Sequence, residues 1–187
     1  MVAGAADVLR RRGLHATSVR DLAKHSGSPL GSTYHYFPGG KTQLAAEAVR
    51  FADELTAAAL ADELQAGPVA GLRAFTAMWR SILVDSNFQA GCPVLAVSIE
   101  DQPEGNDEPR TAAAAAFDNW AGLLSEALRA HGAGADVAQQ SATLIVASLE
   151  GAVAMCRADR STDALDRTAR ALESVVQGVT AEDHATG

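Results

Sequence analysis

Residues 18–41 carry side chains that can bind a phosphate or the edge of a base. The segment reads SVRDLAKHSGSPLGSTYHYFPGGK and combines hydroxyls, phenols, imidazoles and ammonium groups within 24 positions. Hydroxyl and ring N–H groups form single hydrogen bonds with phosphate oxygens or base edges, and a lysine adds positive charge. The chemistry that this segment favours is therefore noncovalent recognition of a polyanion.

The same segment predicts two short helices that would present these groups. Ser18 precedes the first helix with Asp21 three positions later, a pattern typical of an N-terminal capping box. Gly27 predicts the turn, and Ser28 followed by Pro29 predicts the cap and first position of the second helix. A further helix over residues 2–12 precedes them. This order predicts a helix-turn-helix, whose last helix, over residues 29–36, enters the DNA major groove.

Each part of this motif has an expected role in binding double-stranded DNA. The small residues of the last helix would approach the groove closely and read bases. Tyr34, His35 and Lys41 would supply much of the binding affinity by contacting phosphates. Thr17 and Ser18 either cap a helix or contact phosphate, and both roles can hold together. For Tyr36 and Phe37, packing against neighbouring helices is favoured. The expected DNA-binding residues are Thr17, Ser18, Ser28, Pro29, Gly31, Ser32, Thr33, Tyr34, His35 and Lys41.

The charge distribution fits such a role for one end of the chain. Residues 1–50 hold seven basic and three acidic side chains, a net charge of +4, although the whole chain carries −8. The remainder therefore carries −12. A basic segment attached to an acidic body is expected where only that segment meets phosphate.

The remaining residues predict helices throughout. Apolar residues at helical spacing predict helices over residues 42–64, 69–85, 110–130, 137–157 and 162–179, with a short one after Gly91-Cys92-Pro93. The expected fold class is all-α with about nine helices. We expect a DNA-binding domain over residues 1–41 and a second helical domain over residues 42–187, connected by the helix over residues 42–64.

The N-terminal motif resembles that of the tetracycline-repressor (TetR) family of transcriptional regulators. The residues that carry the resemblance are Thr17-Ser18-Val19, Leu22-Ala23, Gly27, Gly31, Tyr34, Tyr36-Phe37 and Lys41. The strings Phe37-Pro38-Gly39-Gly40-Lys41 and Gly91-Cys92-Pro93-Val94 look like the LmrA/YxaF-like branch. Ser28 and Thr33 depart from the family pattern, since such turns usually carry apolar residues there.

The resemblance implies a regulator, most simply a repressor, that binds a palindromic operator as a homodimer. It also implies dimerisation through the last two long helices and release from DNA by a small, mostly apolar effector. Ligand binding would tilt the helix over residues 42–64 and spoil the spacing of the two DNA-reading helices. The candidate effector-binding residues are Phe75, Met78, Trp79, Ile82, Phe88, Cys92, Phe117, Trp120, Leu149 and Met155.

Other classes of protein are less well supported by the sequence. The chain lacks the GxSxG, HExxH, P-loop and GxGxxG patterns of common enzymes, and we expect no catalytic, metal or cofactor site. A ligand-independent DNA-binding or architectural protein is the main alternative, although it would favour a more basic body. Cys92 and Cys156 have no zinc or redox spacing. We expect no membrane-spanning stretch and a cytoplasmic location.

Overall fold

The computed structural model describes residues 1–101 and 107–181, and these residues form nine helices without a strand. The all-α prediction is confirmed. Contacts divide the chain into two compact units, the first formed by Met1–Leu55 with Ala90–Phe117 and the second by Thr56–Gln89 with Asp118–Gly187. This division differs from the expected one at residues 41 and 42, because a segment distant in sequence packs with the N-terminal helices.

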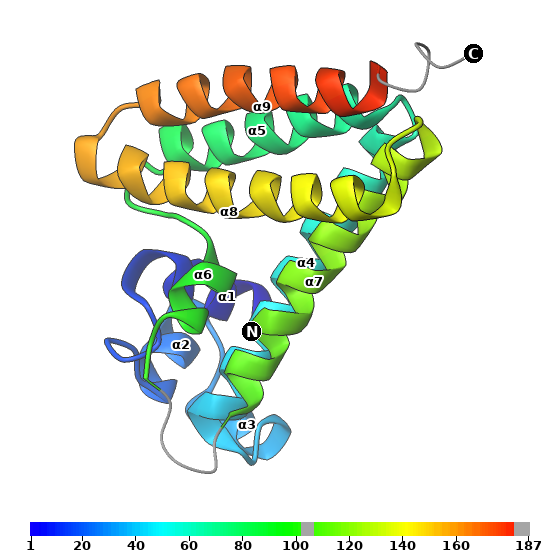
Figure 1. The fold of residues 1–187 in the computed structure, drawn as a ribbon. Helices are drawn as coiled ribbons and strands as arrows, with labels where there is room; N and C mark the ends of the chain where they lie inside the picture. Colours follow the sequence, from blue (N-terminus) through cyan, green and yellow to red (C-terminus); the bar gives the residue numbers. More distant parts are fainter. Residues whose placement is uncertain (102–106, 182–187) are drawn as a thin grey trace. The chain divides into compact units, whose positions relative to one another are not determined.

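Unit 1 begins with three short helices: α1 (Val2–Arg12), α2 (Val19–His25) and α3 (Leu30–Tyr36). The short helix α6 (Pro93–Ser98) packs on α1, as Figure 1 shows. Two long helices belong partly to this unit, namely α4 (Gly40–Leu64) and α7 (Glu108–Ala130). The core of unit 1 is aliphatic, because Leu9, Leu22 and Leu44 are completely buried.

Local sequence signals explain most ends of these helices. Gly13 ends α1 with φ of +75°, and Gly27 turns the chain with φ of +63°, a region that favours glycine. The predicted capping box of α2 is present: the Ser18 hydroxyl accepts from Asp21 N–H, and the Asp21 carboxylate accepts from Ser18 N–H. One predicted cap is wrong. Pro29, not Ser28, is the N-cap of α3, and it has no N–H or side-chain acceptor with which to form a capping hydrogen bond.

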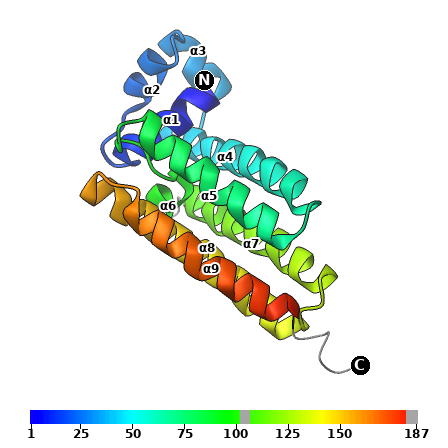
Figure 2. The same cartoon turned by 90° about the horizontal axis from the view of Figure 1, so that it is seen from above.

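Unit 2 contains α5 (Pro68–Asp85), α8 (Ala135–Asp159) and α9 (Asp163–Ala181), which lie side by side in Figures 1 and 2. The rings of Phe75 and Trp120 meet edge to face with centroids 5.9 Å apart, and Trp79 lies 6.1 Å from Phe75. Two ion pairs join α5 to α9, one of them between Arg73 and Glu173 at 2.8 Å. Aromatic packing holds α5 in the unit, and the exposed ion pair between Arg73 and Glu173 adds little.

Helix α8 corrects two expectations. Within the described residues, it is long and apolar enough to cross a membrane by length and composition, but half of its most apolar window is buried. A core helix of a soluble protein meets the same criterion, and α8 packs against α5 and α9. The second correction concerns dimerisation through this helix, for which the small and apolar residues Leu149, Ala152 and Val153 would be natural contacts. They are buried inside unit 2, so they are not available to a second chain.

The exposed side of α8 carries a different stripe of small and apolar residues. These residues recur at intervals of three or four positions, which places them on one face of a helix. They are Leu144, Ala147, Gly151, Ala154, Met155 and Ala158. On α9, Ala171 and Gly178 are exposed and Val175 and Val179 are half-buried, so α9 carries a comparable stripe.

Candidate nucleic-acid interface

The outward surface of α3 is formed by small and aromatic residues. Pro29, Gly31, Ser32 and His35 are exposed, and no atom would lie within 4 Å of a Cβ added at Gly31. Tyr34 is 54% exposed and stacks on no other described aromatic ring, so its phenol is free to meet a partner. This surface offers hydroxyls, an imidazole and close backbone approach, which suits hydrogen bonding in a DNA groove.

Tyr36 belongs to this surface, and the expectation that it packs between helices is wrong. Its side chain is 72% exposed, and its ring meets that of His35 edge to face at 5.2 Å. Phe37, for which packing was also favoured, is half-buried. The sequence offered no signal to separate Tyr36 from Phe37, because both fit an apolar seam and only the orientation of a seven-residue helix distinguishes them.

Two expected DNA-binding residues point inward instead. Thr33 is only 1% exposed and its hydroxyl donates to the carbonyl of Pro29 at 3.2 Å, so its side chain does not reach a base edge. Thr17 is 4% exposed and its hydroxyl donates to the carbonyl of Gly13 at 2.7 Å. Both hydroxyls are used within the turn and the helix, and the expected contacts of these two residues with DNA stay a prediction.

The other expected contacts have mixed positions. Ser18 is exposed but its hydroxyl serves the capping box, and Ser28 is half-buried. Lys41 is half-buried and its ammonium donates to the carbonyl of Leu14 at 3.1 Å, which makes it a brace of the α1–α2 turn as well as a positive charge. Sequence reasoning missed two exposed cations on α2, Arg20 and Lys24. Their position opposite the buried Leu22 and Ala23 was the available signal.

Asp7 connects α1 to α2 through a contact with His25. Its carboxylate accepts hydrogen bonds from Arg10 and Arg11, and it lies 3.0 Å from Nε2 of His25 on α2. Burial raises the pKa of Asp7, but the hydrogen bonds and positive charges of Arg11 and Arg10 outweigh burial and leave that pKa below its ordinary value of 3.8. The charged carboxylate is thus favoured by the fold.

Replacing Asp7 with asparagine is expected to destabilise the protein at neutral pH. Because the pKa of Asp7 is lowered in the fold, its contribution is complete above pH 3.8 and is lost as the pH falls through the folded-state value. We expect the melting temperature at pH 7 to fall by about 2 to 4 °C. Thermal melts from pH 7 downward should show the difference between the two proteins narrowing below pH 3.8. Glu47→Gln, at an exposed pair with Arg50, is the control and should change little.

The candidate effector-binding residues are divided between the two units. Phe75, Trp79, Trp120 and Leu149 are buried in unit 2. Met78, Ile82 and Phe88 are half-buried in the same unit, whereas Cys92 and Phe117 belong to unit 1. Cys92 accepts a hydrogen bond from Leu95 N–H and so serves as the N-cap of α6. Met155 does not lie in the core of unit 2, because 56% of this residue is exposed on α8.

A depression in unit 2 includes candidate effector-binding residues. A groove of about 420 Å³ lies between the C-terminal part of α4 and α5, and Phe75 and Met78 contribute apolar surface to it. Asp62 and Glu63 line the same groove and give it acidic character. Within the described chain, the indole Nε1 of the buried Trp79 on α5 has no hydrogen-bond partner.

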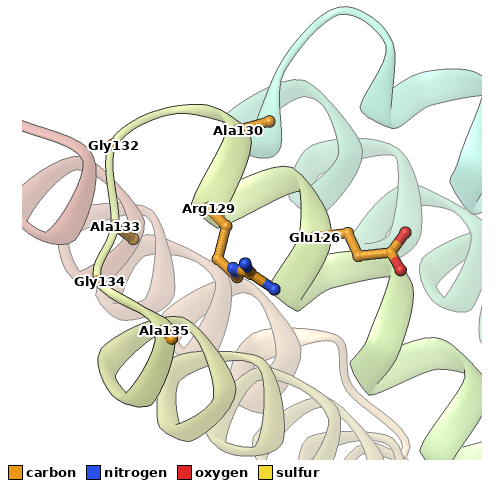
Figure 3. Close-up of a pocket in the computed structure, with 7 residues that line it drawn as sticks. All are labelled: Glu126, Arg129, Ala130, Gly132, Ala133, Gly134 and Ala135. Atoms are coloured by element: carbon orange, nitrogen blue, oxygen red, sulfur yellow. The ribbon is translucent and has the colours of Figure 1, made fainter.

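A second depression, of about 730 Å³, lies at the turn between α7 and α8. Figure 3 shows Arg129 beside the turn formed by residues 132–134, while the carboxylate of Glu126 points away from the guanidinium of Arg129. The depression contains none of the ten expected effector-binding residues. Its open, polar surface therefore adds nothing to the case for an apolar site.

Comparisons with known proteins match both parts of the chain to transcriptional regulators. Residues 2–48 match the family described as bacterial regulatory proteins, tetR family. Residues 68–171 match the family described as transcriptional regulator LmrA/YxaF-like, C-terminal domain. An uncharacterised HTH-type transcriptional regulator of Mycobacterium tuberculosis H37Rv is 42% identical over 94% of this chain and 92% of its own length.

More distant relatives give the same result. The HTH-type transcriptional regulator LmrA of Bacillus subtilis is 31% identical over 82% of each chain. Among solved structures, a regulatory protein TetR from Rhodobacter sphaeroides superimposes with a TM-score of 0.82 at 22% identity, covering 93% of this chain and 95% of its own. The reduced form of NemR from E. coli gives a TM-score of 0.74, covering 93% and 94%. These structures support the fold.

Proposed function

Because the chain belongs to the TetR family of transcriptional regulators, in its LmrA/YxaF-like group, we propose that it is a repressor that binds a palindromic operator as a homodimer. The family and its named relatives are DNA-binding regulators, and the chain is not an enzyme. The observation that carries the proposal is the exposed face of α3, where Tyr34, His35 and Tyr36 stand free of the core.

The proposed division of labour follows the two parts of the sequence. Residues 1–41 would contact operator DNA, with α3 in the major groove and the cations Arg20 and Lys24 of α2 near the phosphate backbone. Residues 42–187 would dimerise and bind the effector. This assignment is compatible with a cytoplasmic location, where DNA is accessible.

Dimerisation would use the exposed stripes of α8 and α9. Two recognition helices must lie about 34 Å apart to read adjacent half-sites, which requires two copies of the chain. Gly151 on α8 and Gly178 on α9 are both open to solvent, and no atom would lie within 4 Å of a Cβ at either position. Small residues on adjacent exposed helix faces allow close packing with an identical copy across a two-fold axis.

The effector would be a small, mostly apolar molecule that binds in unit 2. Support comes from the Phe75–Trp79–Trp120 cluster and from the unpartnered indole N–H of Trp79, which a ligand acceptor could satisfy. The ligand releases DNA only if it binds the released conformation more tightly than the DNA-bound one. A ligand that quenches tryptophan fluorescence yet leaves operator affinity unchanged at saturation would contradict this proposal.

The experiment that tests DNA binding replaces the two exposed tyrosines. Tyr34→Ala and Tyr36→Ala are each expected to weaken binding to the duplex upstream of the gene about tenfold, since each removes a hydrogen bond and contact area at the groove. Gel shifts at moderate salt measure the affinities.

The control for this experiment is Val84→Ala, which trims an exposed residue of α5 far along the chain from α3. It should leave affinity unchanged. Unaltered affinity in both tyrosine variants would show that α3 does not dock as proposed. A protein that binds DNA tightly but responds to no ligand would instead support the architectural alternative.

A further inference from the structure

The turn between α1 and α2 is held by a carboxylate that comes from a distant part of the sequence. Glu100, two residues after the end of α6, accepts hydrogen bonds from the backbone N–H of Leu14 at 2.8 Å and of His15 at 2.6 Å. The same carboxylate lies 2.8 Å from Nδ1 of His15, and only 21% of the Glu100 side chain is exposed. One side chain thus accepts from two backbone N–H groups that lie between α1 and α2 and form no intrahelical hydrogen bond.

The turn is shaped to receive this carboxylate. Gly13 has φ of +75°, and a Cβ at Gly13 would collide with Oε1 of Glu100. The carbonyls of the turn are also hydrogen-bonded, because Thr17 donates to the carbonyl of Gly13 and Lys41 donates to that of Leu14. The carbonyls and the N–H groups of the turn thus have separate partners, since the N–H groups of Leu14 and His15 donate to Glu100.

The segment that carries Glu100 is itself fixed to α1. The N–H of Gly91, just before α6, donates to the carbonyl of Arg10 at 2.9 Å, and α6 packs along α1. Ser18, the cap of α2, follows His15 by only three residues. The conformation of the turn therefore determines the direction in which α2, and after it α3, leaves α1.

We propose that Glu100 is a positioning residue for DNA binding. Its carboxylate fixes the α1–α2 turn and so sets the orientation of α3, without touching DNA itself. This inference rests on the proposed function. Misplacing α3 would impair operator binding, which requires aligned base contacts, much more than nonspecific binding, which depends on charge near phosphates. A residue that served only general stability would affect both kinds of binding equally.

The test compares Glu100→Ala with Asp101→Ala. Asp101 is the adjacent residue, is exposed and carries the same charge, so the control has the same net charge. The probes are a duplex selected by the unaltered protein from a randomised pool and a random-sequence duplex of equal length. The ratio of the two affinities is expected to fall at least about tenfold in Glu100→Ala, with random-duplex affinity nearly unchanged. Asp101→Ala should keep the original ratio.

Two milder variants keep the test informative if Glu100→Ala fails to fold. Glu100→Gln retains one acceptor oxygen, and His15→Ala removes only the ring contact, so each should lower the ratio by about threefold. An unchanged affinity ratio in a folded Glu100 variant, or an equal fall in both affinities, would overturn this inference and leave the proposed function standing. Failure of the unaltered protein to select any duplex would overturn the proposed function, and the inference with it.

Discussion

Replacing Gly151 with glutamine is expected to convert the proposed dimer into monomers. No atom would lie within 4 Å of a Cβ at Gly151, so the isolated chain accommodates the larger side chain. A glutamine on the exposed stripe of α8 would nevertheless keep two helices from approaching closely. We expect dimerisation to weaken by at least about a hundredfold, an effect of the size found at interface hot spots. Operator binding should weaken similarly, because a palindrome needs two linked recognition helices.

The control for this prediction is Gly122→Gln. Gly122 lies on α7, and no atom would lie within 4 Å of a Cβ there either. Both substitutions exchange glycine for a better helix former, so neither should lower the stability of the monomer. Sedimentation equilibrium and gel shifts measure the two effects. A Gly151→Gln protein that remains dimeric would place the interface elsewhere.

Replacing Gly31 with glutamate is expected to abolish operator binding while leaving the fold intact. Gly31 is exposed on α3, and a Cβ there would meet no atom within 4 Å. A glutamate would bring a negative charge to the surface that we propose faces the phosphates, and it would hold the backbone away from the groove. We expect a loss of at least about a hundredfold at moderate salt, combining repulsion with lost base contacts.

Gly134→Glu is the matched control for Gly31→Glu. Gly134 precedes α8, has φ of −60° and is likewise open to solvent, so the change in net charge is the same. Circular dichroism checks that both variants fold, and gel shifts on the selected duplex measure affinity. If Gly134→Glu weakens binding as much as Gly31→Glu, the loss would come from overall charge and α3 would not be the reading helix.

The expected helices agree with the observed ones because their signals are local. Gly27 turns the chain as expected, and the capping box of Ser18 and Asp21 is present. Apolar spacing also accounts for the buried face of α1, since Ala5, Val8 and Leu9 are all in the core. Helix caps and amphipathic spacing depend on interactions within about four residues, which the order of residues alone specifies.

The face of α3 was harder to predict for a physical reason. Over seven residues, a helix makes only two turns, and Thr33, Tyr34 and Tyr36 each satisfy some plausible apolar or polar pattern. The structure buries the smallest of them, Thr33, and exposes both tyrosines. A compact helical core has room for a threonine at this position rather than for a phenol, and this choice depends on packing between helices.

The sequence by itself therefore determined the helices of the described chain and the position of the helix-turn-helix segment. Tertiary structure alone decided which residues of α3 face outward and that Met155 lies on the surface of α8. It also decided that Glu100 accepts hydrogen bonds from the turn at Leu14 and His15. Short-range hydrogen bonds and helical periodicity depend on residues that are close together in the sequence. The contact of Glu100 with His15 joins residues 85 positions apart, and it exists only because α6 packs against α1.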